Sequence, residues 1–178
     1  MYKRQEFKDV SVDELVSMIN KTECALIRTE ADELTYPLHI MVRYEIEKEI
    51  AKGNVNYDKL PELWADKYEE YLGVRPANYK EGVLQDMHWS TGYLGYFPTY
   101  ALGSAYAAQL YATMEKQFDV EEALLTNHFE KITDWLKENV HHYAASKSMA
   151  EIVEEVSGEP FNPDYYTCLL YTSPSPRD

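Results

Sequence analysis

The sequence is short of cysteine, of basic residues and of long apolar runs, and each shortage excludes a class of protein. Only two cysteines occur among 178 residues, and one lies in a terminal segment discussed below, so neither a disulfide nor a cysteine metal cluster is expected. The 17 Lys and Arg residues face 31 Asp and Glu residues, and the net charge of −14 disfavours nucleic acid as a partner. No run of about 18 apolar residues is present, so we expect no membrane partner and a cytoplasmic protein.

Glycine, proline and alternating Val/Thr runs are also scarce, which favours helices over sheets. The chain has seven Gly and eight Pro, with 45% hydrophobic and 27% charged residues, as is typical of a globular domain. No internal repeat of 20–50 residues appears, so a solenoid is excluded. Sixteen tyrosines suit either interior packing or a cleft. We predict an all-α fold.

The last eleven residues need separate treatment. CLLYTSPSPRD, residues 168–178, matches in full one reading frame of a transposase adapter oligonucleotide used in sequencing libraries. We therefore predict that residues 168–178 form an adapter-derived, non-native tail and that residues 1–167 are the protein's own sequence. A natural Ser/Pro-rich terminal linker is the alternative.

Capping signals and apolar periodicity predict where the helices lie. Ser11 with Glu14, and Ser148 with Glu151, form capping boxes that open two of them. The expected helices cover about residues 11–20, 30–52, 61–72, 98–118, 120–143, 148–157 and 162 onward. Residues 74–97 show no sustained period and should form an ordered loop, with a short extended piece through 84–89.

The longest helical pattern, 30–52, carries apolar residues at intervals of four: Leu38, Val42, Ile46 and Ile50. Pro37 fits this helix if its regular part starts near Leu34 or Thr35, and otherwise kinks it. His39 and Arg43 lie one turn apart and are expected to form a polar patch rather than a site.

The five histidines are the obvious metal candidates, but they form no recognisable ligand set. There is no HExxH pattern, which would place two imidazoles on one helix face. His141 and His142 are adjacent and therefore point apart. GxSxG and phosphate-binding glycine loops are also missing. We expect no complete metal site in this chain.

Two stretches carry polar chemistry, and the first is IRTEAD, residues 27–32. Arg28 and Asp32 stand four apart at a helix entrance. They are interpreted either as a surface ion pair or as a guanidinium that Asp32 holds in place to bind a carboxylate.

The second stretch is GVLQDMHW, residues 82–89. An extended backbone would send Asp86 and His88 to one face, so that Asp86 could orient His88 directly or through a water. The alternative is a core histidine beneath Trp89. Tyr93, Tyr96 and Tyr100 follow closely and offer hydroxyl groups.

Taken together, IRTEAD and GVLQDMHW resemble the I/V-R-x-x-A-D and G-x-x-Q-D-x-H-W patterns of the carboxypeptidase Taq family of metallocarboxypeptidases. The segments EADELTYPLHIMVRYEIEKEI, GYFPTYALGSAYAAQ and SGEPFNPDYY are also similar to it, so the resemblance runs from about residue 5 to 167. Pro37, where the family tends to carry Asn, and Tyr93, in a variable spot, are departures.

The resemblance implies a mostly helical clamshell with a deep cleft, often a homodimer, which removes residues one at a time from peptide C-termini. It implies a Zn²⁺ or Co²⁺ cofactor whose bound water attacks the scissile carbonyl. The HExxH helix, the third ligand and the HPF and DxRxT patterns would lie upstream of Met1. Residues 1–167 are accordingly expected to be the C-terminal portion of the catalytic domain, inactive alone and without metal ligands.

The same resemblance implies roles for the candidate residues. Arg28 would recognise the substrate's terminal carboxylate, and His88, supported by Asp86, would hydrogen-bond the substrate or the developing oxyanion. Tyr96 and Tyr100 are further candidate donors, whereas Gln85 is expected to hold the site in position. Asp32 and Gln85 are assigned to the substrate-binding group with Arg28.

Two other hypotheses remain open from the sequence. The chain could be a non-catalytic helical interaction module with an acidic, Tyr-rich surface, or part of a different HExxH-type peptidase. The gene sequence upstream of Met1 would separate them, since the family requires HExxH followed by an HES-type motif.

Overall fold

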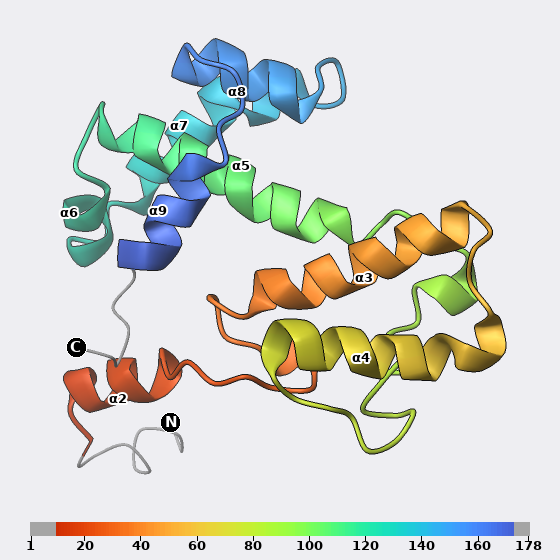
Figure 1. Cartoon of the computed structure of the whole chain (residues 1–178). Coiled ribbons are helices and arrows are strands. Elements are labelled where there is room, and N and C mark those ends of the chain that lie inside the picture. The colour runs from red at the N-terminus through yellow and green to blue at the C-terminus, as the bar shows by residue number, and fades with distance from the viewer. Residues whose placement is uncertain (1–9, 173–178) are drawn as a thin grey trace. The chain divides into compact units, whose positions relative to one another are not determined.

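The computed structural model describes residues 10–172, and within them the chain is helices joined by turns and loops, with no strand (Figure 1). The α-helices are α2 (Val12–Ile19), α3 (Tyr36–Ala51), α4 (Leu60–Leu72), α5 (Pro98–Glu115), α6 (Val120–Leu125), α7 (Phe129–Asn139), α8 (Met149–Ser157) and α9 (Asp164–Thr172). Short 3₁₀ turns are η1 (Arg28–Glu30), η2 (Tyr57–Lys59), η3 (Trp89–Thr91) and η4 (His141–Tyr143). The all-α prediction is confirmed. In residues 10–172 no helix is long and apolar enough to cross a membrane.

The described residues divide into two compact units, the first running to Pro98 and the second from Thr99 to Thr172. Each unit has its own apolar core. In the first unit, α3 and α4 lie side by side (Figure 1) and bury five large side chains. These are Val42, Ile46, Trp64, Tyr68 and Leu72. Every candidate residue except Tyr100 belongs to this unit.

The second unit is built around α5. Its core consists of Leu110, Met114, Val120, Trp135 and Val153. The fully buried Gln109 donates to Ser157 Oγ and the Pro160 carbonyl and accepts from the Asn162 N–H, so α5 holds the link between α8 and α9. Helix α9 continues through residues 168–172, the start of the segment assigned to the adapter. Residues 173–178 of that segment lie outside the described residues.

The predicted helix starts are confirmed where capping chemistry marks them. Ser11 and Glu14 form a reciprocal capping box at α2, and Ser148 and Glu151 form another at α8. Helix α3 starts at Tyr36 with Pro37 in its first turn, where a missing N–H costs nothing. The residues before it, which the sequence pattern included in the helix, form η1 and a turn instead.

The single helix expected over 120–143 is wrong. The chain forms α6, then α7, then η4, because Asn127 takes a left-handed conformation (φ 59°) that ends the first helix. Asparagine tolerates this conformation better than other residues with a Cβ atom. The His128 N–H then bonds the Ala123 carbonyl at 2.8 Å, which closes the turn.

The extended piece expected over 84–89 is also wrong. The Leu84 N–H bonds the Tyr79 carbonyl at 2.9 Å, and the Gln85 N–H bonds the Gly82 carbonyl at 3.1 Å. Local turns therefore use the backbone donors that an extended strand would offer to a neighbour. The prediction that Asp86 and His88 share one face of an extended segment is therefore wrong as well.

Candidate functional site

Arg28 lies in η1, at the entrance to α3, and only 7% of it is exposed. Its guanidinium is bound on one side by the carboxylate of Asp86, with Nη2 to Oδ1 at 2.7 Å and Nε to Oδ1 at 3.2 Å. On the other side, Nη1 donates to the Tyr36 hydroxyl at 2.9 Å. The guanidinium is thus held in a fixed plane by groups 8 and 58 positions away in the sequence.

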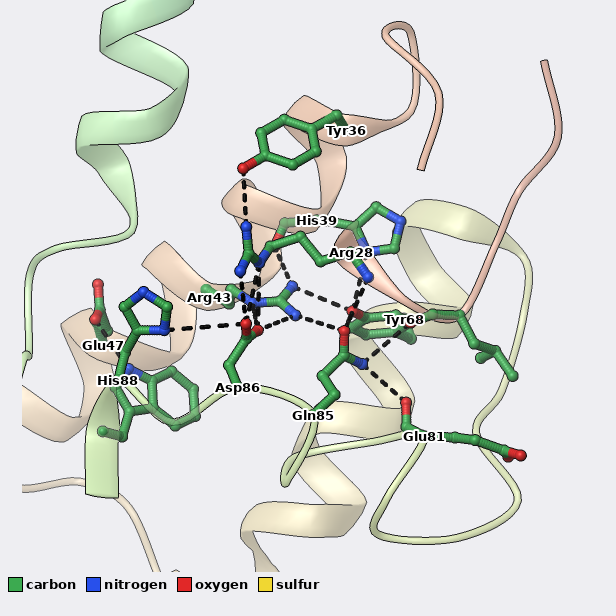
Figure 2. A network of polar contacts seen from close by, with 12 residues as sticks. Arg28, Tyr36, His39, Arg43, Glu47, Tyr68, Glu81, Gln85, Asp86 and His88 are labelled. Carbon is green, nitrogen blue, oxygen red and sulfur yellow. Dashed lines mark hydrogen bonds and ion pairs between the residues drawn. The ribbon is translucent and has the colours of Figure 1, made fainter. Parts of the chain in front are cut away.

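Asp86 also binds a second arginine. Arg43 Nη2 lies 2.6 Å from Asp86 Oδ2, and Arg43 Nε donates to the same oxygen at 2.8 Å (Figure 2). The Arg43 side chain is fully buried, and that of Asp86 is 10% exposed. One carboxylate therefore binds two guanidinium groups, with the shortest Arg28 contact on Oδ1 and the Arg43 contacts on Oδ2.

The protonation states in this cluster follow from its charges. Burial would lower the pKa of Arg28, but the hydrogen bond and the charge of Asp86 outweigh it and raise that pKa. Burial would raise the pKa of Asp86, but Arg28 and Arg43 together lower it. Burial and the same two positive charges lower the pKa of His39 to about 4. At neutral pH, His39 is neutral and the arginine pair exceeds Asp86 by one positive charge.

Gln85 joins the parts of this cluster. Its Nε2 donates to the carbonyls of Leu26 and Glu81, and its Oε1 accepts from the Arg28 backbone N–H, Arg43 Nη2 and the Tyr68 hydroxyl. Both amide donors and the amide oxygen are thus bonded to protein. Gln85 therefore ties η1 to α3 and to its own loop, and its role in the site stays a prediction.

The polar face of α3 was underestimated from the sequence. His39, Arg43 and Glu47 recur every four residues and are all buried, directly beside the apolar stripe of Leu38, Val42, Ile46 and Ile50. Arg43 is therefore part of the central cluster rather than a polar patch. Two adjacent stripes of the same period, one apolar and one polar, were the available signal that both faces are buried.

The predicted pairing of Arg28 with Asp32 is wrong. Asp32 Oδ1 accepts from the backbone N–H groups of Leu34 and Thr35, both at 3.0 Å, and Oδ2 accepts from the Glu23 N–H and the Thr35 hydroxyl. Asp32 therefore stabilises the turn that leads into α3. The carboxylate that binds Arg28 belongs to Asp86 instead.

His88 lies beside Asp86, at the edge of the arginine cluster. Its Nδ1 is 3.9 Å from Asp86 Oδ1, too long for the direct hydrogen bond that was one expected arrangement. The same Oδ1 atom binds Arg28 Nη2. His88 therefore stands next to Arg28 across a shared oxygen, with 19% of its side chain exposed.

Aromatic rings line this side of the site. The ring of His88 stacks on Tyr96, with centroids 5.6 Å apart, and contacts Phe97 at 4.4 Å. Phe97 is buried and also lies 5.6 Å from the Arg28 guanidinium carbon and 5.2 Å from that of Arg43. Tyr96 is 44% exposed. The cations are thus kept from water by an aromatic face on one side.

Five of the seven candidates, Arg28 among them, are linked by contacts. Asp86 and Gln85 hydrogen-bond Arg28, His88 adjoins Asp86, and Tyr96 stacks on His88. Tyr100 lies in the second unit, in the first turn of α5, and its role stays a prediction.

Within residues 10–172, no group of three or more His, Cys, Asp or Glu side chains is arranged to hold a metal ion. The carboxylate and the histidines of the Arg28 cluster do not fit such a site, since Asp86 is occupied by two arginines and His39 bonds Tyr68.

The all-helical first unit thus joins IRTEAD to GVLQDMHW through one arginine–aspartate cluster. The sequence model of the carboxypeptidase Taq (M32) metallopeptidase family matches residues 2–173. The chain belongs to this family.

Individual relatives agree with the family assignment. Carboxypeptidase 1 of Bacillus subtilis is 48% identical over 161 residues, which is 90% of this chain and 32% of the relative. Thermostable carboxypeptidase 1 of Thermus thermophilus is 43% identical over 152 residues, 85% of this chain and 30% of the relative.

Solved structures share the fold as well. A structure of Pyrococcus furiosus carboxypeptidase superimposes with a TM-score of 0.90 at 34% identity, over 93% of this chain and 34% of that one. A crystal structure of an M32 carboxypeptidase from Deinococcus radiodurans gives a TM-score of 0.87 at 33% identity, over 93% and 34%. The chain therefore spans about a third of the length of the relatives it matches.

Proposed function

We propose that this chain is the substrate-binding third of a metallocarboxypeptidase, which removes single residues from peptide C-termini. The observation that carries the proposal is the sharing of Asp86 by Arg28 and Arg43. Two guanidinium groups against one carboxylate leave one positive charge in a site screened from water. Such a charge attracts an anion more strongly than an exposed arginine does.

A peptide C-terminus supplies that anion. An exopeptidase must distinguish a chain end from an internal peptide bond, and the end differs by one carboxylate. A planar guanidinium matches a carboxylate with two parallel N–H donors. Asp86 takes the Nε and Nη2 side of Arg28, so we propose that the substrate approaches the side of the two Nη atoms, beside the Tyr36 hydroxyl.

His88 and Tyr96 are the proposed groups for the neighbouring part of the substrate. His88 lies beside Asp86 and is partly exposed, and the ring of Tyr96 stacks on it. Donors placed there would bind the carbonyl of the last peptide bond and the oxyanion that develops on it. Tyr100 is a further candidate donor.

Family members are metal-dependent peptidases, and we propose zinc, or alternatively cobalt, for the complete enzyme. The proposed contribution of this chain is recognition and orientation of the substrate. Peptides are the proposed substrates, and the homodimer stays a prediction from the family resemblance.

The proposal can be tested in a chimera, in which this chain replaces the matching third of the Bacillus subtilis relative. Arg28→Ala should lower kcat/KM by roughly 30- to 5,000-fold, because an unpaired buried carboxylate costs about 2–5 kcal/mol. Arg28→Lys should recover only part of the loss. Arg75→Ala removes an exposed arginine bound to Asp66 and Glu69 and is the control, expected within about twofold of the parent. A folded Arg28→Ala chimera with unchanged kcat/KM would refute the proposal.

A further inference from the structure

Glu47 is a buried carboxylate one turn beyond Arg43 in α3, and only 6% of it is exposed. Its Oε1 accepts two hydrogen bonds, from Trp89 Nε1 and from the backbone N–H of Gly95, each at 2.9 Å. Its other oxygen, Oε2, is buried and has no hydrogen-bond partner among the described residues. The carboxylate is therefore committed to the loop that carries His88 (Figure 2).

The two donors are the chain neighbours of the two stacked rings. Trp89 follows His88 directly, and Gly95 precedes Tyr96. Gly95 has a φ of 81°, a conformation that residues with a Cβ atom rarely adopt. The Tyr93 N–H bonds the His88 carbonyl at 2.9 Å and closes the first part of this turn. The Glu47 oxygen then ties both ends of the segment 89–95 to α3, with His88 and Tyr96 at stacking distance, 5.6 Å between ring centroids.

The same helix fixes the loop on the other side of His88. Arg43 binds Asp86, two positions before His88, and Glu47 binds Trp89, one position after it. Trp89 is held further by an edge contact with Trp64 in the core, at 5.6 Å. Arg43 and Glu47, one turn apart on α3, therefore hold the chain on either side of His88.

We propose that Glu47 is a positioning residue, which sets the distance and orientation of His88 and Tyr96 relative to Arg28. This inference rests on the proposed role of His88 beside the substrate. Glu47 acts through hydrogen bonds to the loop. What it must supply is an acceptor oxygen at a fixed place, so Glu47→Gln should keep most of the function, whereas Glu47→Leu fills the space but offers no acceptor.

The first test asks whether Glu47 positions the ring, independently of activity. The ¹H–¹³C resonance of the His88 ring is recorded in the chain labelled at histidine, where Tyr96 and Phe97 shift it by their ring currents. Glu47→Leu should move this resonance toward its position in unfolded protein, and Glu47→Gln should move it little. Glu49→Leu is the matched control, because Glu49 lies on the same helix and bonds only Lys52 and Asn54 among the described residues. An unchanged His88 resonance in Glu47→Leu would overturn the inference.

The second test is a double-mutant cycle in the chimera. Glu47→Leu should lower kcat by about 10- to 100-fold with KM changed much less, because misplacement by about 1 Å can cost about 100-fold. In a His88→Ala background the same substitution should have almost no further effect. If the two losses multiply, Glu47 acts elsewhere and the inference is wrong.

The two proposals fail in different ways. If Arg28→Ala leaves kcat/KM unchanged while Glu47→Leu moves the His88 resonance and couples to His88, the proposed carboxylate site is wrong and the positioning role stands. If His88→Ala leaves kcat unchanged, His88 has no part in the reaction and a positioning role for Glu47 in catalysis is refuted.

Discussion

Asp86 is the residue on which the stability of the site depends. Two guanidinium groups with side chains 0% and 8% exposed share its carboxylate, whose own side chain is 10% exposed. Buried ions are costly to desolvate, and removal of one partner leaves the others uncompensated. Removal of one charge from the arginine cluster should consequently lower the free energy of unfolding of the first unit.

Asp86→Asn should therefore destabilise the first unit by about 3–5 kcal/mol, the usual cost of breaking a buried ion pair. Urea unfolding followed by the fluorescence of Trp64 and Trp89, both in this unit, measures the change. The matched control is Asp66→Asn, since Asp66 pairs with Arg75 in water, with side chains 60% and 44% exposed, and should change stability by less than about 1 kcal/mol. Equal effects of the two substitutions would show that burial does not strengthen the Asp86 pairs.

At this scale the sequence identified the members of the site better than their partners. Arg28, Asp86, Gln85 and His88 were selected from two short motifs, but Arg28 was paired with Asp32 because both lie within one helical turn. The true partner is 58 positions away, and short-range spacing carries no information about such a contact. Arg43 was missed for the same reason.

Helix α3 shows how an element positions the site. Its apolar stripe packs on α4, while His39, Arg43 and Glu47 project from successive turns toward Tyr68, Asp86 and Trp89 respectively. A helix buried on both stripes has no strong polar face. Periodicity therefore predicts the C-terminal end of α3, but neither its start nor its place in the site. Helix ends were predictable wherever a capping side chain or a glycine marks them.

Breaks inside helical patterns were not predictable, and Asn127 tests the reason for one of them. Asn127→Ala should destabilise the second unit by about 1 kcal/mol, because a Cβ atom disfavours the left-handed conformation that ends α6. Asn127→Gly should be neutral or stabilising at the same position. Urea unfolding followed by Trp135, which lies in this unit, measures both. Equal losses for Ala and Gly would show that the asparagine side chain, rather than its backbone conformation, ends the helix.

For the whole molecule, the buried charges predict a loss of stability in acid. Burial, with Arg43 and Arg28, lowers the pKa of His39 from its ordinary 6.5 to about 4. Between these values the unfolded chain binds more protons than the folded chain, so stability falls as the pH is lowered from about 6.5 to 4. Asp86 acts in the same direction at lower pH, because its lowered pKa gives stability that is lost as the carboxylate is protonated.

The wild-type chain should accordingly lose up to about 3 kcal/mol between pH 6.5 and 4 through His39, since each unit of pKa shift is worth about 1.36 kcal/mol. His39→Gln should remove most of that slope and leave the part due to carboxylates. His141→Gln, which removes an exposed histidine, is the matched control and should alter the slope much less than His39→Gln. Urea unfolding at a series of pH values compares the three proteins. The same slope in wild type and His39→Gln would show that His39 is not the titrating group.

The all-helical class and the family were predictable from composition and two motifs, because both depend on the order of residues along the chain. The division into two units with separate cores was not, since it depends on contacts between distant residues. The proposed binding of a peptide's terminal carboxylate by Arg28 involves a group of the substrate, so contacts within the chain do not test it.

That claim is tested most directly by the preference for a free C-terminal carboxylate over the corresponding amide, measured as a ratio of kcat/KM values in the chimera. The ratio does not depend on the amount of correctly folded enzyme, so a partly unfolded variant still gives an interpretable result. The parent should prefer the free acid strongly, and Arg28→Ala should lose most of that preference, whereas Arg75→Ala should keep it. An Arg28→Ala chimera that prefers the free acid by the same factor as the parent would contradict the account.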